Sequence, residues 1–398
     1  MLPYLSATIP GCGGDIKLSP EDFLVEEIPA YEPCGSGEHV YLLIEKQGIT
    51  TLEAIRRVSS MLAIPERDIG YAGMKDAIGV TRQYLSGQRI QPEAAAGLTC
   101  DGLRVISAQR HTNKLKLGHL RGNRFSIVVR GVAPHAATNV PAIMEVLQLR
   151  GVPNYFGYQR YGAQGNSHLI GAAMVRRDWH GAVSALIGDS SRILDEQWRS
   201  ATTAFHEGDF ATALQFMPRH CRSERDLLQR LVKRPDSFEQ AFAAVHPRLQ
   251  KLYLSAYQSS LFDQVVARRL DTIDQIMTGD LACKHANGAC FLVEDGAVEA
   301  HRAASFEISA SGPMFGTKMK QPAGEPLAIE REILDNEHID LGAFDLGTGL
   351  RMEGERRPLR VPLASPEFRV EGDCLQLGFE LPKGSYATAV IRELTKTF

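Results

Sequence analysis

The residue whose setting best suits chemistry is Asp76, between Lys75 and Ala77 in the segment DIGYAGMKDAIGVTRQYLSG. Its glycines, set among alternating apolar and polar residues, predict a strand, a tight loop with MKD at its apex, and a second strand. A carboxylate presented by such a loop can act as a nucleophile or a base. Taken alone, however, an aspartate in a glycine-rich turn more often accepts hydrogen bonds from its own backbone.

A second segment of interest is NYFGYQRYG, residues 154–162. Aromatic rings, a glutamine and an arginine among glycines suit the stacking and edge recognition of an unpaired base. Aromatic residues equally often pack a loop against a protein core. The composition by itself leaves both interpretations open.

The charge distribution is uneven between Gly102 and Arg177. One acidic residue, Glu145, stands there against eleven basic ones: Arg104, Arg110, Lys114, Lys116, Arg121, Arg124, Arg130, Arg150, Arg160, Arg176 and Arg177. Such a segment is typical of a phosphate-binding surface, because each Lys or Arg that meets a phosphate releases a counterion. The alternative is a solvated surface whose acidic partners come from elsewhere in the fold.

The sequence lacks the usual motifs of metal-binding and nucleotide-binding sites. Cys283, His285, Cys290 and His301 do not have the ligand spacing of zinc sites, so buried thiols and surface histidines are the better interpretation. The patterns GxxxxGK[ST], GxGxxG after a strand, HExxH and GxSxG are absent. The sequence therefore predicts no metal site.

Periodicity predicts the elements that carry these residues. Residues 15–46 alternate around the turn GSGEH, which predicts a hairpin-like pair of strands. Thr50 with Glu53 is a capping-box pattern and predicts a helix over 51–63. Alternation over 114–131, with LRGN as a turn, predicts a basic hairpin.

The centre of the chain differs from both ends. Residues 166–246 are Ala-rich with helical spacing, and 249–270 predict a helix that is apolar on all sides, as expected between two layers and able to bridge two domains. Residues 281–350 mix short strands with glycine turns, and 359–394 return to strand alternation before a short helix. Strands at both ends with helical sequence between them predict one sheet domain interrupted by an insertion.

Composition sets broad limits. The chain has 398 residues, 44% hydrophobic and 23% charged, with a formal net charge of -3, which indicates a globular protein of two or three domains. Its seven cysteines have no framework spacing, and its start, MLPYLSATIPGCGGDIK, does not resemble a secretory signal. No apolar stretch approaches the roughly 20 residues of a bilayer span. We expect reduced thiols, no membrane segment and a cytoplasmic location.

Eight ordered blocks of the chain resemble the TruD family of tRNA pseudouridine synthases from end to end. They are KLSPEDFLVEE, GSGEHVYLLIEKQGITTLEAI, GYAGMKDAIGVTRQ, KLKLGHLRGNRFSIVVR, GVPNYFGYQRYG, LSAYQSSLFDQVVARRL, GERRPLRV and LPKGSYATAVIREL. Eight blocks in order are far more specific than any single motif.

The resemblance implies an α+β fold. A mixed, largely antiparallel sheet flanked by helices, the pseudouridine synthase catalytic fold, would be interrupted by an inserted α/β domain in a V-shaped molecule. The catalytic domain would comprise residues 1–156 and 351–398, and the insertion residues 157–350. The resemblance also implies tRNA as the partner, no cofactor, no obligate protein partner and a monomer.

The resemblance further implies the reaction. Asp76 matches the catalytic aspartate of the GxKD motif, and the target would be uridine 13 in the D arm of tRNA. The glycosidic bond breaks, uracil turns, and C5 bonds to C1′. A carboxylate can attack C1′ or take a proton to give a glycal, and both routes stay open. Lys17 matches the family's basic residue near the aspartate, with Lys75 as the other candidate.

The remaining site residues also come from the resemblance. The base would be contacted by Phe23, Asn154 and Tyr386, and Phe156 matches the aromatic that stacks on the flipped uracil and recovers roughly a few kcal/mol of lost stacking. The RNA backbone would be bound by Lys114, Lys116, Arg121, Arg124 and Arg160.

The chain departs from the family pattern at three points. Tyr386 stands where phenylalanine is common, which keeps a stacking ring and adds a hydroxyl group. Gly79 stands where alanine is commoner. Residues 178–247 are longer than in compact bacterial members, which leaves the boundaries of the insertion and its role in RNA choice open.

The leading hypothesis is an isomerase, of the intramolecular-transferase class, that converts uridine to pseudouridine in tRNA. A non-catalytic RNA-binding or RNA-remodelling protein is the alternative, and it predicts that Asp76→Asn leaves the function intact. A hydrolase or phosphotransferase that uses Asp76 ranks last, because the sequence offers neither metal ligands nor a phosphate-cradling loop.

Overall fold

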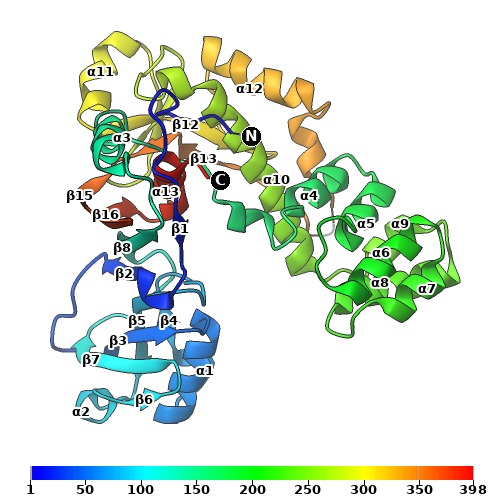
Figure 1. The fold of residues 1–398 in the computed structure, drawn as a ribbon, viewed down its shortest axis with the longest axis horizontal. Helices are drawn as coiled ribbons and strands as arrows, with labels where there is room; N and C mark the ends of the chain where they lie inside the picture. The colour runs from blue at the N-terminus through cyan, green and yellow to red at the C-terminus, as the bar shows by residue number, and fades with distance from the viewer. Residues whose placement is uncertain (1, 348, 398) are drawn as a thin grey trace. The chain divides into compact units, whose positions relative to one another are not determined.

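The computed structural model describes residues 2–347 and 349–397, which form two compact units (Figure 1). The insertion unit comprises residues 153–360 and the described residues before Tyr4, and the sheet unit comprises residues 4–152 and the described residues from 361 onward. The chain changes unit within β9 (Val152–Pro153) and within β14 (Arg360–Val361). The predicted insertion, residues 157–350, lies within the first of these ranges.

The sheet unit is built on a ten-stranded sheet drawn from both ends of the chain. The strand order is β15-β16-β8-β2-β5-β3-β7-β6, with β1 beside β8 and β4 beside β5. Of the pairings described in this sheet, β2–β5 alone is parallel, which confirms the predicted mixed, largely antiparallel sheet. The strands are β1 (Asp15–Ile16), β2 (Phe23–Pro29), β3 (His39–Gln47), β4 (Gly70–Tyr71), β5 (Val80–Gln88), β6 (Thr99–Cys100), β7 (Leu103–His111), β8 (Leu120–Arg130), β15 (Ala364–Glu371) and β16 (Cys374–Pro382).

Two strand pairings predicted from the sequence are wrong. β2 and β3 are not hairpin partners, because β5 lies between them and pairs with both. The predicted basic hairpin over 114–131 is instead one strand, β8, whose first four residues are LRGN. Gly122 serves close backbone approach there and not a turn, since a Cβ at this position would lie 2.3 Å from the carbonyl oxygen of Leu381 in β16.

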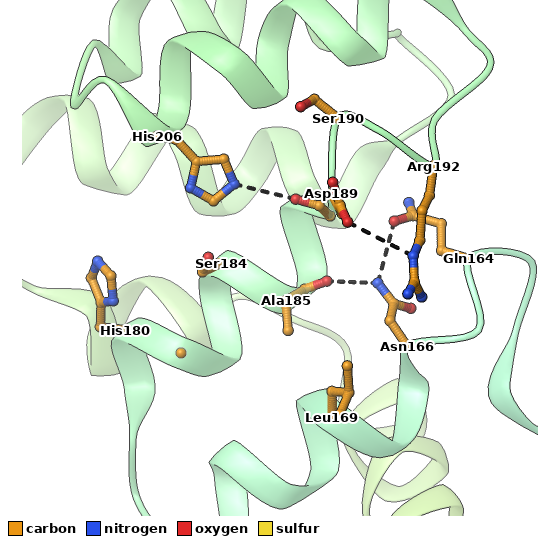
Figure 2. Close-up of a pocket in the computed structure, with 12 residues that line it drawn as sticks. Gln164, Asn166, Leu169, His180, Ser184, Ala185, Asp189, Ser190, Arg192 and His206 are labelled. Atoms are coloured by element: carbon orange, nitrogen blue, oxygen red, sulfur yellow. Dashed lines mark hydrogen bonds and ion pairs between the residues drawn. The ribbon is translucent and has the colours of Figure 1, made fainter. Parts of the chain in front are cut away.

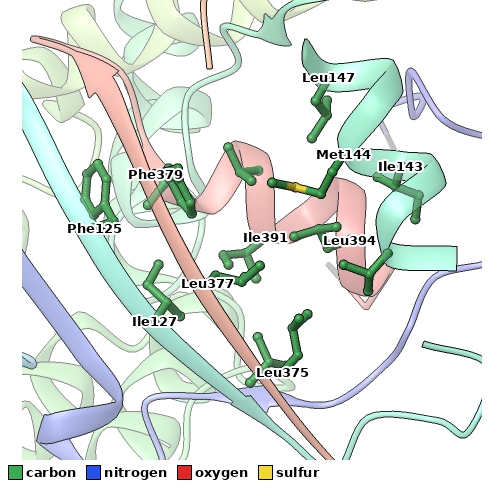
Figure 3. Close-up of a cluster of buried hydrophobic side chains, with 14 of the residues drawn as sticks. Phe125, Ile127, Ile143, Met144, Leu147, Leu375, Leu377, Phe379, Ile391 and Leu394 are labelled. Carbon is green, nitrogen blue, oxygen red and sulfur yellow. The ribbon is translucent and has the colours of Figure 1, made fainter. Parts of the chain in front are cut away.

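Helices α3 (Ala136–Arg150) and α13 (Ala387–Thr395) cover the part of the sheet that contains β8 and β16. Figure 3 shows their apolar side chains meeting those of the two strands. The cluster is built by strand alternation, which turns every second residue to the helices. Its labelled members are Phe125, Ile127, Ile143, Met144, Leu147, Leu375, Leu377, Phe379, Ile391 and Leu394.

A second cluster lies between α1 (Thr51–Leu62) and strands β3, β5 and β7. The predicted helix over 51–63 is confirmed: the hydroxyl of Thr50 accepts the backbone N–H of Glu53 at 3.2 Å, which satisfies one of the free donors of the first turn. A short helix, α2 (Pro92–Ala95), packs on β7.

The insertion unit combines helices with a small antiparallel sheet of order β11-β10-β12-β13. Its central helix is α10, which packs against α4 and also against β12 and α12, so the predicted position between two layers is confirmed. α10 lies wholly inside this unit. The elements are α4 (Ser167–Val175), α5 (Trp179–Ile187), α6 (Glu196–His206), α7 (Phe210–Phe216), α8 (Arg222–Lys233), α9 (Phe238–Phe242), α10 (Pro247–Arg268), β10 (Leu281–Lys284), β11 (Cys290–Leu292), α11 (Gly296–Ala304), β12 (Ile308–Met314), α12 (Gly324–Asn336) and β13 (Glu355–Pro358).

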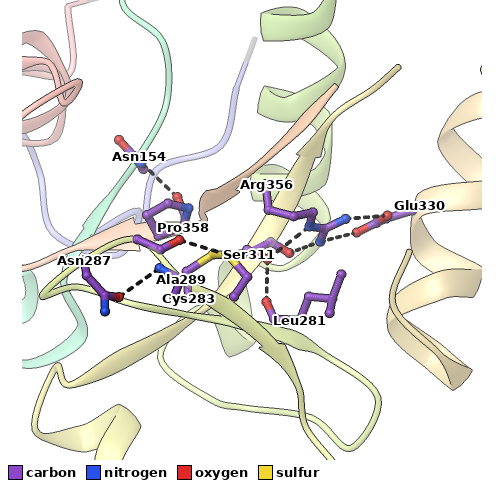
Figure 4. The surroundings of a disulfide bond; sticks show 11 residues. Asn154, Leu281, Cys283, Asn287, Ala289, Ser311, Glu330, Arg356 and Pro358 are labelled. Atoms are coloured by element: carbon purple, nitrogen blue, oxygen red, sulfur yellow. Dashed lines mark hydrogen bonds and ion pairs between the residues drawn. A yellow bond between two sulfur atoms is a disulfide. The ribbon is translucent and has the colours of Figure 1, made fainter. Parts of the chain in front are cut away.

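The expectation of reduced thiols is wrong for two of the seven cysteines. Cys283 and Cys290 form a disulfide across β10 and β11 (Figure 4). The antiparallel register places these two residues opposite each other, with their Cα atoms 4.1 Å apart. The remaining cysteines, Cys12, Cys34, Cys100, Cys221 and Cys374, are free.

Among the residues described, no helix combines the length and the apolar character needed to cross a membrane.

Candidate active site

Asp76 lies in the loop between β4 and β5, as predicted for a strand-loop-strand segment. Its side chain is exposed, and within residues 2–347 and 349–397 the carboxylate forms no hydrogen bond or ion pair. The loop backbone is nevertheless held, since the carbonyl oxygens of Asp76 and Ala77 accept hydrogen bonds from Lys46 Nζ at 2.6 Å and from Gly48 N–H at 3.1 Å. The loop therefore presents a carboxylate from a fixed backbone.

Lys17 and Phe23 lie at the same end of the sheet as this loop. β2 begins at Phe23 and runs parallel to β5, which begins at Val80. The segments that precede the two strands therefore lie at the same end of the sheet. The ammonium of Lys17 lies 4.4 Å from the centroid of the Phe23 ring. Burial lowers the pKa of Lys17, and the nearby Asp76 carboxylate opposes this shift. The structure thus brings three predicted site residues together.

Gly79 makes the close approach of the two segments possible. Its φ of +97° lies in the region that favours glycine, and a Cβ there would lie 2.4 Å from the carbonyl oxygen of Phe23. In this geometry, the glycine that departs from the family pattern cannot be replaced by alanine without a backbone shift.

Lys75 points into the protein. Its ammonium donates a hydrogen bond to Asn123 Oδ1 and lies 4.0 Å from Glu27 Oε2. Burial raises the pKa of Glu27 to about 7, although the nearby ammonium of Lys75 lowers it. Burial also lowers the pKa of Lys75. Lys75 therefore has its own carboxylate partner, whereas Lys17 has none besides Asp76 in the described part of the chain.

Sequence reasoning missed Lys46. This residue is 1% exposed on β3 and donates to the backbone oxygens of Asp76 and Ile49. Burial lowers its pKa to about 8, with Asp76 opposing the shift and Lys75 adding to it. A lysine inside the apolar run HVYLLIEKQ was the available signal, because lysines are rarely buried without a specific role. With Lys17 and Lys75 it gives the surroundings of Asp76 a positive potential.

Tyr386 is the second predicted base-contacting residue of the sheet unit, after Phe23. It precedes α13 in an extended conformation, and its carbonyl oxygen accepts a hydrogen bond from Ala389 N–H at 3.0 Å. The chain reaches it from β16, which pairs with β8, and β8 in turn pairs with β2. Its side chain is half-buried.

Asn154 and Phe156 belong to the insertion unit. The side-chain amide of Asn154 donates to the carbonyl oxygen of Pro358 at 2.8 Å and accepts from Arg357 Nη2 at 2.6 Å. The backbone N–H of Phe156 donates to Asp263 Oδ1 at 2.9 Å, and the Phe156 ring meets the Phe262 ring edge-on with centroids 5.7 Å apart. β13 and α10 therefore hold the aromatic loop on two sides.

The basic residues between Gly102 and Arg177 differ in the partners that the fold gives them. Four of its arginines are neutralised by acids from other parts of the fold, in the pairs Arg104–Glu45, Arg124–Glu380, Arg130–Asp22 and Arg176–Glu337. Of the predicted RNA-backbone residues, Arg160 donates to Ser255 and Ser259, and Lys114 donates to the carbonyl oxygen of Arg67. Lys116 and Arg121 are exposed, and their side chains have no hydrogen bond or ion pair in the described chain.

Two hollows accompany these elements. One of ≈ 280 Å³ in the sheet unit is lined by Glu26, Glu27, Ile28, Pro29, Glu32, Leu43, Arg82, Tyr84, Arg121 and Arg124. The larger, of ≈ 490 Å³, lies among α4, α5 and α6 of the insertion unit and contains no predicted site residue (Figure 2). The larger of these two hollows is therefore not the one that contains predicted site residues.

Within the described residues, no cluster of three or more His, Cys, Asp or Glu side chains is arranged to hold a metal ion. His285, one of the residues considered for such a site, hydrogen-bonds Ser309 Oγ at 2.8 Å. Burial lowers the pKa of His285 to about 4.

Comparisons with known proteins agree over the full chain. Residues 1–394 match the family described as tRNA pseudouridine synthase D (TruD). The chain is 61% identical over 397 residues to tRNA pseudouridine synthase D of Geotalea daltonii, covering 100% of both chains, and 60% identical over 393 residues to that of Geobacter sulfurreducens, covering 99% of this chain and 96% of the relative. A crystal structure from Methanosarcina mazei, assigned as tRNA pseudouridine synthase D, matches with a TM-score of 0.84 at 25% identity, covering 99% of this chain and 96% of that chain.

Proposed function

The chain belongs to the tRNA pseudouridine synthase D family, and on this premise we propose that it isomerises uridine to pseudouridine in tRNA, at uridine 13 of the D arm. The observation that carries the proposal is the exposed carboxylate of Asp76 on a loop whose backbone is held from β3. A reactive group on a supported loop is already oriented when the substrate arrives, which lowers the entropic cost of reaction.

Asp76 is the proposed nucleophile. Its carboxylate either attacks C1′ of the ribose as the bond to N1 breaks, or removes a proton from the ribose to give a glycal. The detached uracil turns and C5 bonds to C1′. This step displaces the carboxylate from C1′ in the first route, and in the second the ribose regains its proton from the carboxyl group. The proton on C5 is then lost, and N1 takes up a proton. Atoms and electrons balance within the substrate, so the reaction consumes no co-substrate.

Lys17 is the proposed basic partner of Asp76. The ammonium of Lys75 is already bound by Asn123 and paired with Glu27, whereas Lys17 lies over Phe23 and interacts with Asp76. A partly buried cation beside the carboxylate stabilises the charged nucleophile.

Base recognition is assigned to Phe23, Tyr386, Asn154 and Phe156, each taken separately. Aromatic rings offer faces on which a flipped uracil stacks, and the amide of Asn154 suits the donor and acceptor groups on the edge of uracil. For the RNA backbone, Lys116 and Arg121 are the strongest candidates, because their side chains are exposed and uncommitted within the described residues.

The test is pseudouridine formation on an unmodified tRNA transcript, detected by carbodiimide treatment and primer extension, without added metal or nucleotide. We expect the wild type to modify uridine 13 and Asp76→Asn to bind tRNA without modifying it. Asp101→Asn, at a turn in the same unit, is the matched control and should retain activity. Modification of another uridine would contradict the target, and unchanged modification by Asp76→Asn would contradict the nucleophile. Binding without modification by the wild type would favour the RNA-binding alternative.

A further inference from the structure

We propose that Arg357 is a positioning residue for base recognition, which orients the amide of Asn154 and restrains the ring of Phe156 through a single guanidinium group. The inference rests on the proposed function, because it takes Asn154 and Phe156 as the residues that meet the uracil. All three residues lie in the insertion unit.

Two hydrogen bonds fix the orientation of the Asn154 amide. Arg357 Nη2 donates to Asn154 Oδ1 at 2.6 Å, and Asn154 Nδ2 donates to the carbonyl oxygen of Pro358 at 2.8 Å. Turning the amide over would place its NH2 group against the guanidinium and its oxygen against a carbonyl oxygen, so that both contacts would become repulsive. Arg357 and the β13 backbone therefore fix which end of the amide is the donor.

The side chain of Asn154, a residue that is 3% exposed, keeps hydrogen-bonding groups that these two contacts do not use. A primary amide has two N–H donors and two acceptor lone pairs, and the contacts to Arg357 and Pro358 use one of each. The remaining N–H and lone pair are of the types that pair with a carbonyl oxygen and with the N3–H of uracil. Only one of the two orientations of the amide pairs its donor and acceptor with those on the edge of a given base. The orientation therefore contributes to base selection.

Arg357 also contacts the ring of Phe156. The guanidinium carbon of Arg357 lies 4.4 Å from the centroid of the Phe156 ring and 5.4 Å from that of Phe262. A planar guanidinium stacks on an aromatic ring while its N–H groups remain in plane for hydrogen bonds, which an ammonium group cannot do. The same side chain thereby couples the ring that would stack on the base to the amide that would read its edge.

Arg357 itself is placed by the small sheet. It lies on β13 opposite Gly312 of β12, and its neighbour Arg356 forms a buried ion pair with Glu330, at 2.8 Å, on α12 (Figure 4). Successive strand residues point to opposite faces, so Arg356 fastens β13 to α12 while Arg357 serves the aromatic loop. Neighbouring arginines in the block GERRPLRV thus have different functions.

The experiment compares wild type, Arg357→Lys, Arg357→Met, Asn154→Ala and the double variant Arg357→Met/Asn154→Ala. We measure tRNA affinity, the single-turnover rate of pseudouridine formation with saturating enzyme, and the midpoint of thermal unfolding. We expect both Arg357 variants to lower the rate on the order of ten- to a hundredfold with tRNA affinity retained, because misplacement of the base impairs the chemical step. Charge alone, in Arg357→Lys, should not rescue the rate.

The double variant shows whether Arg357 acts through Asn154 or independently of it. If Arg357 acts partly through Asn154 and partly through Phe156, removing both Arg357 and Asn154 should slow the reaction by less than the product of the two single losses, because the part that acts through Asn154 is lost only once. Arg268→Met, which removes an exposed arginine that pairs with Glu332 in the same unit, is the matched control and should leave the rate unchanged. If Arg357→Met does not fold, Arg357→Lys with a wild-type unfolding midpoint decides the matter.

Two results would overturn the inference while the proposed function stands: a wild-type rate in Arg357→Lys, or multiplied losses in the double variant. Absence of pseudouridine formation by the wild type would overturn the proposed function and the inference with it. The two failures are therefore distinguishable.

Discussion

The buried ammonium of Lys46 donates a hydrogen bond of 2.6 Å to the main-chain carbonyl oxygen of Asp76, and a second of 2.9 Å to that of Ile49. β3 thereby holds the loop that presents the Asp76 carboxylate without touching the carboxylate itself. The loop backbone is supported from within the sheet, while the reactive group stays open to a substrate.

Replacing Lys46 should impair both stability and activity. Lys46→Met keeps much of the side-chain volume but leaves two carbonyl groups without their donor, which should lower the free energy of unfolding by about 1–3 kcal/mol. Pseudouridine formation should fall further than the loss of folded protein explains, because the loop carrying Asp76 loosens. Urea unfolding and single-turnover rates test this, with the exposed Lys251→Met as the control. A wild-type rate in Lys46→Met would contradict this role.

Glu27 should make stability depend on pH. Its pKa rises from the ordinary value of 4.5 to about 7 in the folded protein, so the folded state binds more protons than the unfolded state between these values. The contribution of Glu27 to stability is therefore complete below pH 4.5 and is lost as the pH rises to about 7, by at most roughly 3 kcal/mol. Urea unfolding at several pH values should show a flatter profile for Glu27→Gln than for the wild type. Exposed Glu66→Gln should retain the wild-type slope.

Asp263 and Tyr161 should contribute unequally to the aromatic loop. The carboxylate of Asp263 accepts hydrogen bonds from Phe156 N–H at 2.9 Å and from the Tyr161 hydroxyl at 2.6 Å. Tyr161→Phe removes one of these hydrogen bonds and should cost about 1 kcal/mol, whereas Asp263→Ala removes both and should cost about 2–4 kcal/mol. Thermal and urea unfolding provide the measurement. Equal losses would show that the carboxylate is not the common anchor of the loop.

Arg121 and Arg124 should differ in their contribution to tRNA binding. Arg124 Nη2 lies 2.6 Å from Glu380 Oε1 in an ion pair. The Arg121 side chain has no acidic partner among the described residues. Arg121→Gln should weaken binding and reduce the salt dependence of log Kd by about one, and Arg124→Gln should do less. Glu380→Gln should tighten binding, since it releases Arg124.

Filter binding or anisotropy over a range of salt concentrations measures these effects. Arg369→Gln, an exposed arginine outside the basic segment, serves as the control. Equal losses from Arg121→Gln and Arg124→Gln would mean that the ion pair with Glu380 opens when RNA binds.

The disulfide determines how many cysteines can be alkylated before and after reduction. Protein denatured without reductant should react with an alkylating reagent at five cysteines, and reduced protein at all seven, because Cys283 and Cys290 are joined. Mass spectrometry of the intact protein reads both numbers. Seven labelled cysteines without reductant would show that the pair is reduced in the isolated protein.

Local chemistry in the sequence was sufficient to predict several elements. The predicted helices over 51–63 and 249–270 correspond to α1 and α10, and the segment around Asp76 is a strand, a loop and a strand. Caps, helical spacing and alternation act between residues a few positions apart, so a single sequence carries them. The ordered blocks likewise identified the family, and with it the mixed sheet built from both ends of the chain.

Contacts between distant residues were decided by the tertiary structure. Alternation identifies a strand without naming its partner, which is why β2 and β3 were wrongly paired and LRGN was taken for a turn. Whether a charge is available depends on neighbours such as Glu380, 256 positions from Arg124, and the disulfide depends on the register of β10 and β11. The support of Asp76 by Lys46 belongs to the same class, because a buried lysine is recognised as a donor only when the carbonyl groups it meets are known.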